Sequence, residues 1–141
     1  MNSLRIAALV AVAIVIFVAL DVCFACFGFG RVHRFLSKSD RLGRPAVERD
    51  GYSMRAVTAT RKAINIATKC YYRAGKDCLP RAITTTVLLR LQGVAASLKV
   101  GVKKYPFAGH AWVECHGIVI DDPNSVAGQY SELGKAAMAD R

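Results

Sequence analysis

The stretch from Cys78 to Asp122 constrains the fold more than any other part of the chain, because one helix pattern is followed there by strand patterns. The helix is predicted to begin at Asp77 or Cys78, with Pro80 in its first turn, where a missing N–H does no harm, and Gly93 ends it. Between these residues an apolar stripe recurs at the helical period, and it consists of Ile83, Val87, Leu88 and Leu91. We therefore expect an α+β domain in which helices pack on a small antiparallel sheet.

The expected strands follow this helix in order. Val94 to Val102 ends in an alternation of apolar and polar residues, and His110 to Cys115 and Ile118 to Asp121 are predicted to form a hairpin around His116-Gly117. The tail from Asn124 to Arg141 is polar and rich in small residues, so we expect it to be only partly ordered.

A further helix is predicted upstream, from Gly51 to Ala74, with Gly75 after its end. Its apolar residues follow a loosely helical pattern, which places the basic residues on the solvent side. These basic residues are Arg55, Arg61, Lys62 and Lys69.

The N-terminal segment is unusually apolar, because Ile6 to Leu20 contains no charged residue and Val22 to Phe29 continues the run. Three interpretations are open: a helix buried against the domain or associated with a membrane, a helix that spans the membrane, and a cleaved secretory signal. The first is favoured, since Asp21 interrupts the run and no clear cleavage site follows. We accordingly divide the chain into an apolar N-terminal helix in residues 1–30 and a second domain in residues 31–141.

The net charge of +10 is distributed unevenly, with the basic excess in residues 31–104. Such a basic region favours an acidic partner, for example a peptide or an anionic membrane face. The basic segment that starts at Arg31 suits the cytoplasmic side of a membrane. A nucleic acid is not an expected partner, because the basic residues show no aromatic interleaving and no known reader motif.

The five cysteines form no regular framework, and their odd number favours a reducing compartment over a disulfide scaffold. Cys23 and Cys26 have the C-x-x-C spacing of zinc and redox sites. They lie in an apolar run with no second pair downstream, so we interpret them as two buried apolar thiols. No metal or organic cofactor is expected.

Cys78 and His110 are the candidate nucleophile and base. A thiol at a helix start is stabilised as thiolate by the first-turn N–H groups, which can also bind an oxyanion. The small residues Gly109 and Ala111 leave space for a substrate beside His110, and Trp112 is placed to wall the site. A small buried cysteine and a core histidine are the alternative, and the combination with a following Asp pair favours the catalytic interpretation.

The carboxylate that orients His110 depends on the register of the last hairpin. A two-residue turn puts Asp121 on the face of His110, whereas a three-residue turn with a bulge puts Asp122 opposite His110. Because a shift of one residue in the strand pairing decides between Asp121 and Asp122, the strand pattern leaves both candidates open.

Several of these motifs together resemble a known family. They are Cys78-Leu79-Pro80-Arg81-Ala82, Gly93-Val94 before a strand that ends Val100-Gly101-Val102, and His110-Ala111-Trp112-Val113-Glu114 followed by Gly117. These motifs are similar to those of lasso-peptide biosynthesis B proteins, and more narrowly of the stand-alone B2 leader peptidases in the transglutaminase-like superfamily. The resemblance covers most of the chain.

The resemblance implies a transglutaminase-like (papain-like) cysteine peptidase that removes the leader from a ribosomally made precursor peptide. Carried over, Cys78 is the nucleophile and His110 the base, and the family's acid, twelve residues after the histidine, selects Asp122. The implied partners are a leader-binding B1 protein and an ATP-dependent macrolactam cyclase. The expected location is the cytoplasm, and an association of residues 6–29 with the inner face of the membrane is left open.

Overall fold

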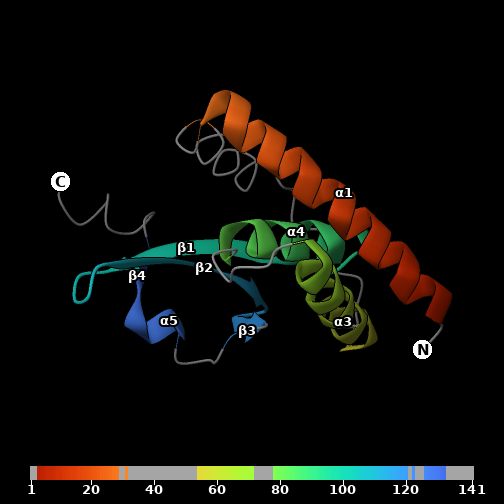
Figure 1. The fold of residues 1–141 in the computed structure, drawn as a ribbon. Helices are drawn as coiled ribbons and strands as arrows, with labels where there is room; N and C mark the ends of the chain where they lie inside the picture. The colour runs from red at the N-terminus through yellow and green to blue at the C-terminus, as the bar shows by residue number, and fades with distance from the viewer. Residues whose placement is uncertain are drawn as a thin grey trace.

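The computed structural model describes residues 3–28, 31, 54–71, 78–120, 122 and 126–132, and the structural statements below concern these residues. Along this part of the chain lie α1 (Ser3–Phe27), α3 (Met54–Tyr71), α4 (Cys78–Leu91), β1 (Ser97–Lys103), β2 (Ala108–Cys115), β3 (Ile118–Ile120), α5 (Val126–Gln129) and β4 (Ser131–Glu132). The fold is α+β, as predicted, with helices packed on an antiparallel sheet and an apolar helix at the N-terminus (Figure 1).

The strands are ordered β3-β2-β1-β4. β1 pairs with β2 over its whole length, and this pairing places Gly101 opposite His110. β2 and β3 are joined by a two-residue turn, with Cys115 opposite Ile118. Both turn residues have positive φ, 50° at His116 and 77° at Gly117, which is the type I′ geometry that suits the twist of a hairpin.

The tail contributes a strand that the sequence analysis did not predict. β4 pairs with β1, so that Glu132 lies opposite Gly101 and Ser131 opposite Val102. A strand of only two residues is too short to show an alternating pattern. Residues 124–125 and 133–141 of the predicted tail, and Gly75, Asp77 and Asp121 among the residues named above, lie outside the described part.

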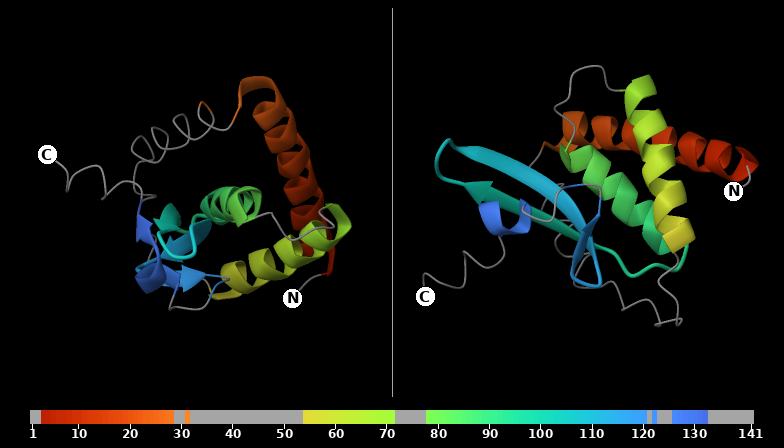
Figure 2. Two further views of the ribbon diagram at one scale, coloured as in Figure 1. Left: turned by 60° about the vertical axis from the view of Figure 1, so that its left-hand side comes forward. Right: turned by 90° about the horizontal axis from the view of Figure 1, so that it is seen from below.

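α4 lies between the sheet and α1 (Figure 2). Leu89 packs with Ala111, Val113 and other apolar residues of the sheet, while its neighbour Leu88 packs with Phe17 of α1 and with α3. A fully buried leucine stabilises a fold by roughly 1.5–3 kcal/mol relative to an exposed one. The helix that starts at Cys78 is therefore anchored on two opposite sides.

The packing corrects two expectations about exposure. Cys26 is exposed and Cys23 is only half-buried, so the prediction of two buried thiols was wrong, because they lie near the end of α1, where few contacts cover them. Leu91 was assigned to the buried stripe of its helix but is 72 % exposed, since α4 buries its residues on two sides rather than along one stripe.

No group of three or more His, Cys, Asp or Glu side chains that could hold a metal ion occurs within the described ranges.

Gly101 is buried in the middle of β1. A Cβ atom at Gly101 would lie 3.0 Å from three atoms, namely the backbone oxygen of Ser131, a ring carbon of Trp112 and the Cβ of Tyr130. The backbone oxygen and the Cβ of Tyr130 move only if the chain that carries β4 moves. The sheet therefore requires glycine here so that the tail can approach β1.

Replacing Gly101 with alanine is expected to lower the free energy of unfolding by about 1–3 kcal/mol, the typical cost of overpacking. Urea denaturation followed by circular dichroism measures this change. The matched control is Gly109→Ala on β2, where the nearest atom to an added Cβ is 4.0 Å away and little change is expected. Equal losses in the two variants would contradict the packing of β4 described above.

Candidate active site

Cys78 is the first residue of α4, as the sequence predicted, and its side chain is half-buried. The first-turn N–H groups of a helix have no partner inside the helix. Pro80 has no N–H, so the donors at this end belong to Cys78, Leu79 and Arg81. The thiol therefore lies where the positive end of the helix dipole favours an anion.

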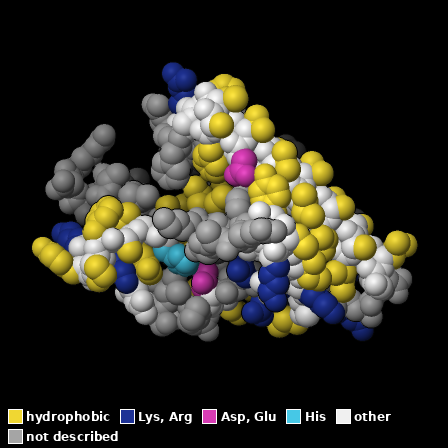
Figure 3. All heavy atoms as spheres, in the orientation of Figure 1, with side chains coloured by type: hydrophobic (Ala, Val, Ile, Leu, Met, Phe, Trp, Pro, Cys, Tyr) yellow, Lys and Arg dark blue, Asp and Glu magenta, His cyan; other side chains and the backbone are white. Residues whose placement is uncertain are grey.

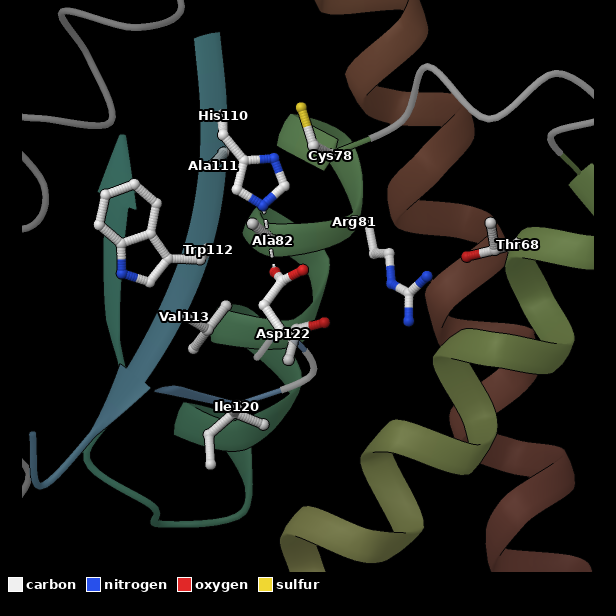
Figure 4. A pocket seen from close by; sticks show the side chains of 11 residues that line it. Thr68, Cys78, Arg81, Ala82, His110, Ala111, Trp112, Val113, Ile120 and Asp122 are labelled. Atoms are coloured by element: carbon white, nitrogen blue, oxygen red, sulfur yellow. Dashed lines mark hydrogen bonds and ion pairs between the residues drawn. The ribbon is translucent and has the colours of Figure 1, made fainter. Parts of the chain in front are cut away.

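His110 lies on β2, and its Nε2 atom is 3.3 Å from Oδ2 of Asp122. The Cys78 thiol lies on the side of the ring that faces away from Asp122 (Figure 4). The ring thus has the carboxylate on one side and the sulfur on the other. No hydrogen bond joins the thiol to the ring among the described residues, as is common for catalytic contacts before substrate binds.

Asp122 reaches His110 for a reason that strand alternation did not anticipate. The observed hairpin has the two-residue turn, for which alternation predicts Asp121. β3 ends at Ile120, however, so the alternation stops before either carboxylate. The contact of Asp122 with His110 is the one that the family resemblance had selected, and Asp121 lies outside the described residues.

Cys78, His110 and Asp122 line one pocket of about 220 Å³ (Figure 4). They come from the start of α4, from β2 and from the segment after β3, so the pocket lies where α4 meets the sheet. Oγ1 of Thr68 and Oγ1 of Thr85 are buried without a hydrogen-bond partner in the described part of the chain, and both threonines line the same pocket.

Two aromatic rings flank the His110 ring. The ring of Trp112 is nearly parallel to it, with centroids 6.3 Å apart, and the ring of Tyr130 is 5.4 Å away. Trp112 is 1 % exposed and donates a hydrogen bond from Nε1 to Oε1 of Glu114 at 2.9 Å. Trp112 is therefore part of the core and also forms a wall of the pocket, and its hydrogen bond to Glu114 helps to hold the indole ring in place.

Tyr130 was missed by the sequence analysis. It lies between α5 and β4, in the polar tail, and nothing near it in sequence indicates a contact with β2. The one signal that could have found it is Gly101, because a glycine within a strand often marks a close approach of another segment.

Arg81 lies one helical turn after Cys78 and lines the same pocket. Its guanidinium NH2 group donates a hydrogen bond to Oδ1 of Asn65 at 2.7 Å. Because this bond is to a neutral amide, the positive charge of Arg81 is kept near the start of α4, where it favours an anionic sulfur or an oxyanion.

Cys115 provides an internal contrast to Cys78. It is fully buried on β2, and this burial raises the pKa of its thiol from 9.0 to about 11. A neutral, buried thiol is a poor nucleophile. Of these two cysteines, only Cys78 is placed to react.

The raised pKa of Cys115 predicts a specific pH dependence of stability. Above about pH 9 the unfolded thiol loses its proton, whereas the folded thiol keeps it until about pH 11. Between these pH values the unfolded state binds fewer protons than the folded state. The contribution of the Cys115 thiol to the free energy of unfolding is therefore complete below pH 9 and is lost as the pH rises from 9 to 11. Urea unfolding of the protein and of Cys115→Ala measures it, and the stability difference between them should shrink from pH 9 to 11. A stability difference that stays constant from pH 9 to 11 would show that burial does not raise the pKa of the Cys115 thiol.

Thiol-dependent acyl transfer requires a nucleophilic thiol, a base and a group that orients the base. The site provides all three: Cys78 at a helix start, His110 on β2, and Asp122 beside Nε2 of His110. The model of the transglutaminase-like superfamily matches residues 14–135, and the chain belongs to this superfamily. Membership is compatible with a cysteine peptidase or an acyltransferase. The match begins inside α1 and extends past β4. No curated protein and no solved structure matches the chain significantly.

Proposed function

We propose that this chain is a cysteine peptidase that removes the leader from a ribosomally synthesised lasso-peptide precursor. Cys78 is the nucleophile, His110 the general base and acid, and Asp122 the residue that orients His110. The observation that carries the proposal is the shared pocket in which Asp122 contacts one side of the His110 ring and the thiol lies on the other. The motifs around Cys78 and His110, which resemble those of stand-alone leader peptidases, supply the substrate class.

Acylation begins when the Cys78 thiolate attacks the carbonyl carbon at the junction of leader and core. The S–C bond forms as the oxygen becomes an oxyanion, which first-turn N–H groups of α4 are placed to bind. His110 then gives its proton to the departing amine as the C–N bond breaks. The core peptide leaves, and the leader remains as a thioester on Cys78.

Deacylation uses the same residues in reverse. His110 takes a proton from a water molecule, which attacks the thioester carbonyl, and the C–S bond breaks. The carboxylate of Asp122 stabilises the imidazolium formed in each half of the reaction and holds the ring in one orientation. The leader leaves with a free carboxylate, and Cys78 returns to its starting state.

The basic side chains exposed on α3 support an acidic or polar peptide substrate. Arg61, Lys62 and Lys69 line a groove together with Asn65. Asn65 also accepts the hydrogen bond of Arg81, which lines the pocket, so the groove and the pocket are neighbours. An extended peptide could contact the groove while its scissile bond lies beside Cys78, and a leader-binding B1 protein would present it there.

The test is to incubate the purified chain with a candidate lasso-peptide precursor, with and without a leader-binding B1 protein, and to measure the masses of the products. Hydrolysis gives two fragments whose masses together exceed that of the precursor by one water. Added amine that appears in the leader fragment would instead identify an acyltransferase, which uses the same thioester. An uncut and unmodified precursor under both conditions would reject the proposal.

A further inference from the structure

The outer side of α1 is apolar along its whole length. Ala13 and Phe17 are buried against α3 and α4, whereas the residues at helical spacing on the opposite side are exposed. We call these exposed residues the outer stripe: Leu4, Ala8, Ala11, Val12, Val15, Val18, Ala19, Val22 and Cys26. Leu4 is 82 % and Val15 67 % exposed. Figure 3 shows hydrophobic side chains along this helix.

We propose that α1 lies in the plane of a membrane surface, with its outer stripe in the lipid and the rest of the protein on the water side. The helix is long and apolar enough to cross a bilayer, so its orientation has to be argued from its contacts. The proposal is independent of the peptidase assignment, because it uses no residue of the catalytic pocket.

Lipid is the occupant that this surface fits. A helix of this length extends about 37 Å, and no residue of its outer stripe offers a charge or an amide to a partner. A stable protein interface of such size normally has a polar rim and hydrogen bonds, whereas a lipid surface requires neither. Arg31, exposed shortly after the end of α1, adds a positive charge that favours anionic headgroups.

The contacts of α1 with the domain exclude a membrane-crossing orientation of this fold. Near its start, Arg5 donates to Oε1 of Gln92 at 2.8 Å. Near its end, Asp21 accepts a hydrogen bond from the Tyr71 hydroxyl at 2.8 Å. These contacts are about 24 Å apart along the helix, most of the roughly 30 Å thickness of the hydrocarbon core.

A crossing α1 would therefore carry α3 and α4 into the hydrocarbon. Arg61, Lys62 and Lys69 are exposed on α3. Each such charge costs at least about 2.5–3.5 kcal/mol at the bilayer centre. An in-plane α1 keeps these charges in water and buries only the outer stripe.

Flotation with vesicles tests membrane binding of the full chain. The protein is expected to float with vesicles of phosphatidylcholine and phosphatidylglycerol. Val15→Glu combined with Val22→Glu, two residues on the outer stripe, should weaken binding at least about tenfold, since it removes apolar area and adds charge to the lipid side. The matched control is Phe107→Glu with Ile118→Glu, which changes two exposed apolar residues and the net charge equally but away from α1.

Nitroxide labels test the orientation. Labels are placed singly at Leu4→Cys, Val15→Cys and Cys26, with Cys23, Cys70 and Cys78 replaced by alanine and Cys26 also replaced where it is not the probe. In-plane binding predicts one common, shallow depth, measured by the relative collision rates with oxygen and with a polar nickel complex. A deep label at position 15 between shallow ends would overturn the proposal in favour of a span. Absent flotation, or equal loss in both double variants, would also overturn it.

Discussion

Replacing Cys78 with alanine is expected to abolish precursor cleavage, with kcat/KM falling by about 10⁵–10⁶-fold, the scale on which loss of a catalytic nucleophile is felt. Alanine cannot form the thioester, and the pocket offers no second thiol, because the Cys115 thiol is buried on β2 and its pKa is raised to about 11. Mass spectrometry of the precursor over time measures the loss, and circular dichroism checks that the variant is folded like the unaltered protein.

The matched control for this prediction is Cys70→Ala, which removes an exposed thiol on α3 outside the pocket and should leave the rate unchanged. Comparing Cys78→Ala with Cys70→Ala also distinguishes an enzyme from a protein that only binds the precursor. If the chain only held the precursor for another enzyme, Cys78→Ala would support maturation as well as the unaltered protein does. Full activity in that variant would end the peptidase hypothesis.

Replacing Asp122 with asparagine is expected to lower kcat/KM by roughly 10²–10⁴-fold while the fold is retained. The amide keeps the shape of the carboxylate but loses the charge that stabilises the His110 imidazolium during turnover. The variant should still form the thioester slowly, so the acylation and deacylation rates should both fall in single-turnover measurements.

Asp121→Asn is the matched control, because it removes the same charge from the neighbouring residue. Its cleavage rate is expected to stay within a few-fold of the unaltered protein. If Asp121→Asn caused the large loss and Asp122→Asn did not, the contact between His110 and Asp122 at 3.3 Å would not be the one used in catalysis.

The candidate nucleophile and base could be placed from the sequence because local signals fix their elements. Pro80 and Gly93 mark the two ends of one helix, which puts Cys78 at its start. The alternating residues around His110 and the His116-Gly117 turn mark a hairpin, which puts His110 on a strand. Such signals act within a few residues of the side chain concerned, and all of them are visible in the chain itself.

Contacts between distant segments could not be predicted in this way. Pairing of β4 with β1 joins residues about thirty positions apart, and this pairing explains both the requirement for glycine at position 101 and the position of Tyr130 beside His110. Asp122 is a partial exception. The strand pattern left Asp121 and Asp122 open, the family resemblance selected Asp122, and the end of β3 at Ile120 explains why strand alternation does not apply to either residue.

The exposed face of α1 shows another limit. A run without charges predicts a helix, but it does not say which sides of that helix are covered. The answer came from Ala13 and Phe17, which pack on α3 and α4 and leave the outer stripe bare. A purely apolar segment has no polar side by which its orientation could be read in advance.

Because the ring of Trp112 lies nearly parallel to the ring of His110, the fluorescence of Trp112 depends on the charge of His110. Trp112 is the only tryptophan in the chain, so all indole emission originates beside the imidazole. A cationic imidazole is an efficient quencher of an adjacent excited indole, whereas the neutral ring is a weak one. A simple fluorescence titration would thus follow the charge on His110 directly, without label, substrate or partner.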